Sequence, residues 1–145
     1  MRFQETVKMP VPEAVTIPPV SGWADIVQHS DKSICRLYLA VTSASDEPAM
    51  CGKDVLYRMS LNCKTSHCAG SAHAAWLLEC PESRIPVEWQ QAKHLFFLRE
   101  VWGDEQGYLH VLVAQPEEAG KWTFGYLADF GAALMGPRDW VVMID

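Results

Sequence analysis

The stretch His94-Leu-Phe-Phe-Leu-Arg-Glu-Val-Trp102, followed by Gly103-Asp-Glu-Gln-Gly107 and Tyr108-Leu-His-Val-Leu-Val-Ala114, carries the clearest structural signal in this chain. Both outer segments are rich in aromatic and β-branched residues, which favour strands. The segment between them combines glycines with acidic residues, a composition typical of turns. The pattern therefore predicts a β-hairpin.

Other segments are predicted from shorter patterns. Residues Ile34–Val41 and Trp140–Ile144 are apolar runs of strand length, and Asp54–Leu61 alternates apolar with polar residues, which indicates a strand with one buried face. The segment His73–Cys80 fits either a strand or the end of a short helix, because its periodicity does not separate the two.

An amphipathic helix is predicted over residues 123–135. Large apolar residues recur there at every fourth position, a spacing that places them on one helix face. These residues are Trp122, Tyr126, Phe130 and Leu134. We therefore expect an α+β fold, an antiparallel β-rich sheet with at least this one amphipathic helix packed on it.

The length of 145 residues is typical of one domain, so we expect a single domain over residues 1–145. Residues 9–20 are expected to form a Pro-rich extended N-terminal arm, because each proline fixes its own φ and pushes the preceding residue toward extended geometry. The arm is interpreted as a strap over the core, with a partner-binding segment as the alternative. Its prolines are Pro10, Pro12, Pro18 and Pro19.

Charge and hydropathy exclude two classes of partner. The formal net charge is -6, and the 12 Lys and Arg residues form no basic stripe, which argues against direct nucleic-acid binding. No apolar run approaches the roughly 18 residues of a membrane span, and no export signal is recognised at the N-terminus. We therefore expect a cytoplasmic protein whose five cysteines are thiols or metal ligands.

One short segment is rich in residues that bind zinc. Its spacing is poor for a structural zinc site, because Cys63 and Cys68 are too far apart for a tight knuckle and no second pair follows. A thiol-dependent site would instead need Cys68 activated by a histidine such as His94 or His110. The candidate metal ligands are Cys63, His67, Cys68 and His73.

The hairpin turn is the candidate partner-binding site. Trp102 and Tyr108 flank the acidic pair Asp104 and Glu105, so aromatic anchors adjoin an acidic rim, as in many protein interfaces. The alternative is a cross-strand aromatic pair that only stabilises the hairpin.

The function expected is that of a non-catalytic protein-binding module without a cofactor. The chain contains no Gly-x-Ser-x-Gly motif and no phosphate-binding loop, and its paired carboxylates fall in turns. Such a module would act as a small inhibitor, immunity-type or regulatory protein that occludes a partner protein with a basic surface. The second hypothesis is a small metal-binding or Cys/His thiol-dependent enzyme that uses the Cys63–His73 loop and zinc, and a third is small-ligand binding in an aromatic-lined cleft.

Overall fold

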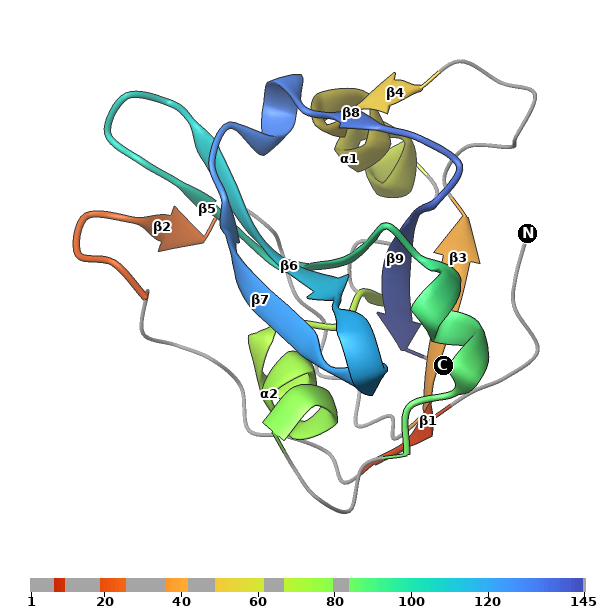
Figure 1. Cartoon of the computed structure of the whole chain (residues 1–145). Coiled ribbons are helices and arrows are strands. Elements are labelled where there is room, and N and C mark those ends of the chain that lie inside the picture. Colours follow the sequence, from red (N-terminus) through yellow and green to blue (C-terminus); the bar gives the residue numbers. More distant parts are fainter. Residues whose placement is uncertain are drawn as a thin grey trace.

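Strand β5 (His94–Gly103) runs through the middle of a mixed sheet in the computed structural model of the chain, which describes residues 7–9, 19–25, 36–41, 49–61, 67–79 and 84–144. The strands lie in the order β1, β3, β9, β5, β6, β7, and β2 also pairs with β5 (Figure 1). Their bounds are β1 Val7–Lys8, β2 Ala24–Asp25, β3 Arg36–Val41, β6 Leu109–Pro116, β7 Trp122–Leu127 and β9 Asp139–Ile144.

The predicted hairpin is confirmed. Strands β5 and β6 pair antiparallel, and Asp104 N–H donates to the Tyr108 carbonyl oxygen at 3.0 Å to close the turn. Gly107 has φ of +87°, in the left-handed region that a residue with a side chain rarely adopts. The predicted strands near residues 36–41 and 140–144 are confirmed as β3 and β9, and β9 runs parallel to β5, so the sheet is mixed.

The α+β fold class is confirmed, with helices on both faces of the sheet (Figure 1). Leu95 and Phe97 of β5 pack with α2 (Ser71–Glu79) and the 3₁₀ helix η2 (Val87–Gln91). Their neighbours Phe96 and Leu98 pack on the opposite face with α1 (Gly52–Leu61) and η4 (Phe130–Ala132). Successive strand residues point to opposite faces, so an unbroken apolar run serves both cores.

The remaining short elements lie at the rim of the sheet. Strand β4 (Met50–Cys51) pairs with β8 (Leu134–Met135) in a separate two-stranded ladder next to α1. The 3₁₀ helix η3 (Glu118–Gly120) makes the connection from β6 to β7.

A β-bulge interrupts β5. Its register with β6 shifts between Phe97 and Trp102, so Leu98 and Val101 both reach the α1 side of the core although they are three positions apart. Four residues of β5 lie between Phe97 and Trp102, against only Val111 of β6 between their partners, and these three extra residues allow the odd spacing on one face.

The segment that leads into α2 lies between β5 and β9 beside this bulge. Arg99 N–H donates to the Ala69 carbonyl oxygen at 3.1 Å, and Ala69 N–H donates to the Val142 carbonyl oxygen at 2.9 Å. Cys68 also forms an isolated bridge with Met143. These bonds satisfy backbone groups of strands that pair directly only at His94–Phe96, and they position the start of α2.

The prediction of an amphipathic helix over residues 123–135 is wrong. This part of the chain forms β7, then η4 and β8, and β7 pairs with β6 from Pro116↔Trp122 to Val111↔Leu127. A spacing of four residues keeps side chains on one face of a helix, but it is also a multiple of the strand period of two. The pattern therefore did not distinguish the two structures.

The prediction of a strand over Asp54–Leu61 is also wrong, because these residues belong to helix α1. Val55 is buried and Leu56 and Met59 are partly buried in the same core cluster, a helical spacing, whereas Tyr57 is 65% exposed. The ambiguous segment His73–Cys80 lies in α2, which ends at Glu79. Most of the predicted arm over residues 9–20 lies outside the described residues.

Gly52 provides a test of the packing between α1 and η4. Its N–H donates to the Ala133 carbonyl oxygen at 2.8 Å, and a Cβ atom there would overlap the Phe130 carbonyl oxygen and lie 2.6 Å from its ring. We expect Gly52→Ala to lower the free energy of unfolding in urea by about 1–3 kcal/mol. The matched control is Gly125→Ala, which adds a methyl group where no atom lies within 4 Å. Equal stability of the two variants would contradict this packing.

Candidate functional site

Among the strands that the structure describes, β7 forms one edge of the sheet. Its burial differs from that of β5, because all four residues from Thr123 to Tyr126 are exposed. The strand reads Trp-Thr-Phe-Gly-Tyr-Leu and contains neither a charged residue nor a proline, the residues that usually protect an edge strand against pairing. Its outer row of N–H and C=O groups is therefore suited to pair with another strand.

Two aromatic side chains stand on one face of this edge. Phe124 and Tyr126 lie opposite Ala114 and Leu112 of β6, which places them on the α2 side of the sheet. Phe124 is 47% exposed and Tyr126 is 38% exposed. Aromatic residues are enriched at protein interfaces.

A chain of ring contacts joins β7 to the hairpin turn. Tyr126 meets the Trp23 ring edge to face, with centroids 5.5 Å apart, and Trp23 stacks on His110 at 4.1 Å. His110 Nε2 lies 2.8 Å from Asp104 Oδ2. The exposed aromatic edge and the acidic turn therefore belong to one continuous surface.

Asp104 organises the turn. Its Oδ2 accepts the hydrogen bond from His110, and its Oδ1 accepts the backbone N–H groups of Gln106 and Tyr108, both at 2.9 Å. The hydrogen bond from His110, aided by those from the backbone, lowers the pKa of Asp104 below its usual range. The carboxylate is therefore ionised at neutral pH and marks an acidic end of the surface.

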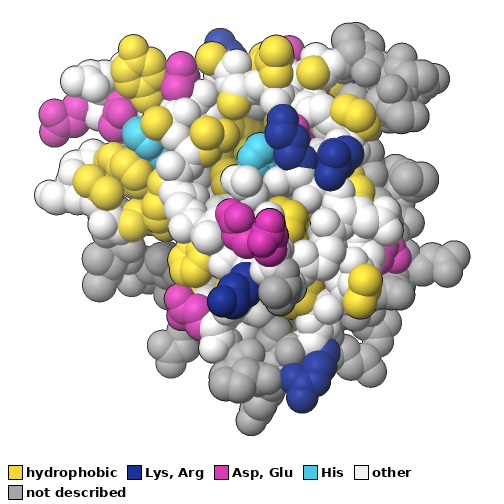
Figure 2. All heavy atoms as spheres, viewed as in Figure 1, with side chains coloured by type: hydrophobic (Ala, Val, Ile, Leu, Met, Phe, Trp, Pro, Cys, Tyr) yellow, Lys and Arg dark blue, Asp and Glu magenta, His cyan; other side chains and the backbone are white. Residues whose placement is uncertain are grey.

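Three of the four predicted partner-binding residues lie on the surface, and the fourth is buried. Asp104, Glu105 and Tyr108 lie on the surface, and Tyr108 is 49% exposed. Trp102 is only 4% exposed and pairs with His110 across the hairpin, so it belongs to the core rather than to a contact surface. Figure 2 shows acidic side chains at the tip of this hairpin, beside a histidine and hydrophobic side chains.

The other end of β7 is acidic as well. Glu117 and Glu118 are exposed in the connection from β6, and Thr123 Oγ1 donates to Glu117 Oε1 at 3.0 Å. The exposed Lys121 is the basic residue in this connection. We call the exposed residues of β7 and the acids at its two ends the β7 surface: Thr123, Phe124, Gly125, Tyr126, Asp104, Glu105, Glu117 and Glu118.

Cys68, the candidate nucleophile, is completely buried. Its Sγ lies 3.9 Å from Met143 Sδ, and burial raises the pKa of the thiol to about 12. His94 and His110, which a thiol-dependent site would need as activators of Cys68, are instead paired with Asp139 and Asp104. Cys68 is therefore protonated at neutral pH and does not provide a reactive thiolate.

The predicted zinc ligands are only partly described. Cys63 lies outside the described residues, and within them no group of three or more His, Cys, Asp or Glu side chains is placed to hold a metal ion. His73 is buried in α2 with its Nδ1 accepting the Gly70 N–H at 3.0 Å. The zinc site stays a prediction.

His73 and Glu100 together cap the start of α2. Glu100 Oε1 accepts both the N–H and the hydroxyl of Ser71, at 3.2 and 2.7 Å, while His73 accepts from Gly70. His73 thus occupies the role of the third-position Glu or Gln of a capping box. A Cβ on Gly70 would overlap the Glu100 carboxylate, so glycine is required for this close approach.

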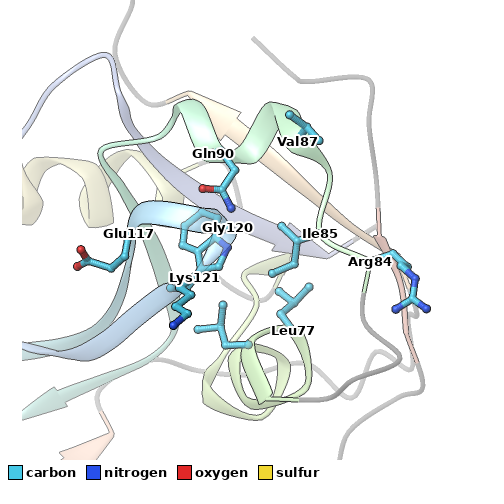
Figure 3. Close-up of a pocket in the computed structure, with 10 residues that line it drawn as sticks. Leu77, Arg84, Ile85, Val87, Gln90, Glu117, Gly120 and Lys121 are labelled. Atoms are coloured by element: carbon cyan, nitrogen blue, oxygen red, sulfur yellow. The ribbon is translucent and has the colours of Figure 1, made fainter.

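Two hollows flank β7. The larger has a volume of about 930 Å³ and lies between the end of α2, residues 84–90 and the β6–β7 connection. Figure 3 shows that Leu77 and Ile85 face into it, whereas Arg84 and Val87 point away. The smaller, of about 390 Å³, lies along β7 on the other face of the sheet and contains His94 and Asp139 in its wall.

Comparisons of the chain with protein-family models, with curated proteins and with solved structures found no match. Among the helices that the structure describes, none has both the length and the apolar character needed to cross a membrane. The geometry of the described residues is therefore the basis for a functional proposal.

The buried His73 predicts a pH dependence of stability. Burial, and next the Arg99 guanidinium, lowers the pKa of His73 to about 4 in the folded chain. In the unfolded chain the pKa is about 6.5, so the unfolded state binds the proton first as the pH falls. We expect the free energy of unfolding to decrease between about pH 6.5 and 4 by about 3 kcal/mol from this group.

The matched variant is His73→Asn, which keeps an acceptor for the Gly70 N–H but does not titrate. Urea unfolding of both proteins across this pH range isolates the histidine, because all other titrating groups are shared. Parallel loss of stability in the two proteins would show that His73 does not cause the dependence.

Proposed function

We propose that this chain is a non-catalytic protein-binding module that captures an extended, basic segment of another protein along β7. By occupying that segment it would act as a small inhibitor, immunity-type or regulatory protein. The observation that carries the proposal is the outer edge of β7, with which no strand in the described part of the chain pairs, and which offers backbone hydrogen bonds beside Phe124 and Tyr126. Addition of a peptide strand to such an edge is a common mode of recognition.

The charges of the β7 surface favour a basic segment. Asp104 and Glu105 lie toward one end of the strand, and Glu117 and Glu118 lie at the other end. Lys121 is the one positive charge in the connection that contains Glu117 and Glu118. The chain as a whole carries a net charge of -6. A lysine-rich or arginine-rich strand would meet favourable charge at both ends, while its backbone and apolar side chains contact the aromatic centre.

The same charges argue against a second copy of this chain as the occupant. Antiparallel pairing of two β7 strands would bring acidic ends together, and like charges across strands are destabilising. We expect a monomer by size-exclusion chromatography with light scattering. A dimer that Phe124→Lys converts to a monomer would assign the edge to self-association instead.

The alternative function, a metal-binding or thiol-dependent enzyme, draws no support from the described part of the Cys63–His73 loop. Cys68 is buried with a pKa of about 12, and the His73 Nδ1 is engaged within α2. Zinc binding is tested by native mass spectrometry of protein purified without chelator.

The aromatic pair is tested with a defined peptide. A peptide of about eight residues that alternates lysine with valine matches an edge strand in length and pattern. We expect it to shift the backbone amide signals of β7 in an NMR titration. The double variant Phe124→Ala, Tyr126→Ala should weaken binding about tenfold or more, because exposed aromatic anchors contribute most at interfaces.

Tyr57→Ala is the matched control, because Tyr57 is an aromatic residue of α1 that is 65% exposed and lines neither of the two hollows beside β7. It should bind like the unmodified protein. Unchanged affinity of the double variant, or equal binding of a peptide with glutamate in place of lysine, would overturn the proposal.

The acidic ends are tested through association kinetics. Raising salt from about 0.05 to 0.5 M should slow association of the lysine peptide severalfold, because salt screens the attraction between exposed charges. The variant Glu117→Lys, Glu118→Lys should associate more slowly at low salt and show a weaker salt dependence. An association rate that ignores both changes would remove charge steering from the proposal.

A further inference from the structure

His94 and Asp139 form a rigid pair at the ends of two adjacent parallel strands. They are direct partners in the β5–β9 ladder, and His94 Nδ1 lies 2.8 Å from Asp139 Oδ1. The other carboxylate oxygen, Oδ2, accepts the Gly136 N–H at 2.9 Å. Both carboxylate oxygens are therefore engaged, and the orientation of the imidazole ring is fixed.

The second ring nitrogen of His94 is left for a ligand. An ionised carboxylate only accepts hydrogen bonds, so Nδ1 carries a proton and donates to Asp139. Nε2 makes no hydrogen bond with any residue that the structure describes. The His94 side chain is 31% exposed, whereas that of Asp139 is 9% exposed, so the histidine is the member of the pair that a solute can reach.

The pair lines the groove of about 390 Å³ along β7. This volume falls within the range of pockets for small ligands. Most of its wall is apolar, and its charged groups collect beside the histidine. The apolar wall includes Phe96, Val113, Leu127 and Leu134, and Lys93 adds a positive charge. Figure 2 shows hydrophobic side chains gathered beside a histidine and basic side chains on this face.

We propose that this groove binds a small carboxylate with an apolar body. When the ring of His94 carries both protons, Nδ1–H donates to Asp139 and Nε2–H donates to the ligand carboxylate, with the exposed Lys93 ammonium adding attraction. The apolar part of the ligand then covers the wall formed by β5, β6 and β7. This site goes beyond the protein-binding function and does not depend on it.

The groove runs along the same strand as the β7 surface, and its lining includes the whole stretch from Thr123 to Leu127. Thr123 and Leu127 face the groove side, whereas Phe124 and Tyr126 have their β6 partners on the α2 side. The groove is therefore tested with variants of Lys93, His94 and Leu134, which line it but do not belong to the β7 surface, so that failure of this proposal is distinguishable from failure of peptide binding.

Phenylacetate and its uncharged analogue phenylacetamide are suitable probes, followed by amide NMR titration of the full chain. We expect phenylacetate to shift signals of His94 and its neighbours in the groove and, at a pH at which the ring carries both protons, to bind about fivefold or more tightly than phenylacetamide, because one charge-assisted hydrogen bond distinguishes them. Lys93→Gln and His94→Gln should each reduce this preference.

Lys121→Gln is the matched control for Lys93→Gln, because both lysines are exposed but Lys121 does not line this groove. Leu134→Asp adds repulsion at the rim without disturbing the core, since Leu134 is 70% exposed, and should weaken phenylacetate binding more than phenylacetamide binding. Equal affinity of the two probes, shifts confined to other regions, or no saturable shift up to about 50 mM would overturn the proposal.

Discussion

Strand β5 is buried on both faces, and the rest of the structure is arranged around this constraint. Apolar side chains leave the strand in both directions, so each face of the sheet requires a covering layer. Helix α2 and η2 supply one layer, and α1 and η4 supply the other. The backbone of β5 needs partners as well, which β6 provides on one side and β9, followed by the Ala69 segment, on the other. Both layers cover the middle of the sheet, whereas β7 stays exposed.

The bulge in β5 connects this constraint to the buried polar groups. It directs Leu98 and Val101 into one core and leaves Glu100 beside the start of α2, where its carboxylate accepts two hydrogen bonds from Ser71. A buried carboxylate is costly without such donors, and the first N–H groups of a helix lack partners of their own. Cys68 and His73 are buried beside this arrangement. Burial raises the pKa of Cys68 and lowers that of His73, so at neutral pH the thiol is protonated and the imidazole is neutral.

Strand β7 links the two proposed sites because a strand presents different residues to the two faces of a sheet. Its aromatic residues face the α2 side and adjoin the acidic turn through Trp23 and His110. The stretch from Thr123 to Leu127, the aromatic residues included, also lines the groove that contains His94 and Asp139. Backbone pairing along the edge and ligand binding in the groove therefore use one element, whereas the charged groups proposed to hold the ligand, Lys93 and His94, lie outside the β7 surface.

The sequence by itself determined the hairpin, the strand at 36–41 and the final strand, because their signals are local: β-forming residues bounded by turn residues. It also identified the acidic turn with Tyr108. Only the tertiary structure decided between helix and strand at 54–61 and 123–135, since spacings of two and four residues suit more than one structure and the neighbouring element selects among them. The placement of Trp102 in the core and the exposure of Phe124 and Tyr126 followed from that choice. Whether a side chain is buried depends on which elements pack against it, and the local sequence of one segment does not specify those neighbours.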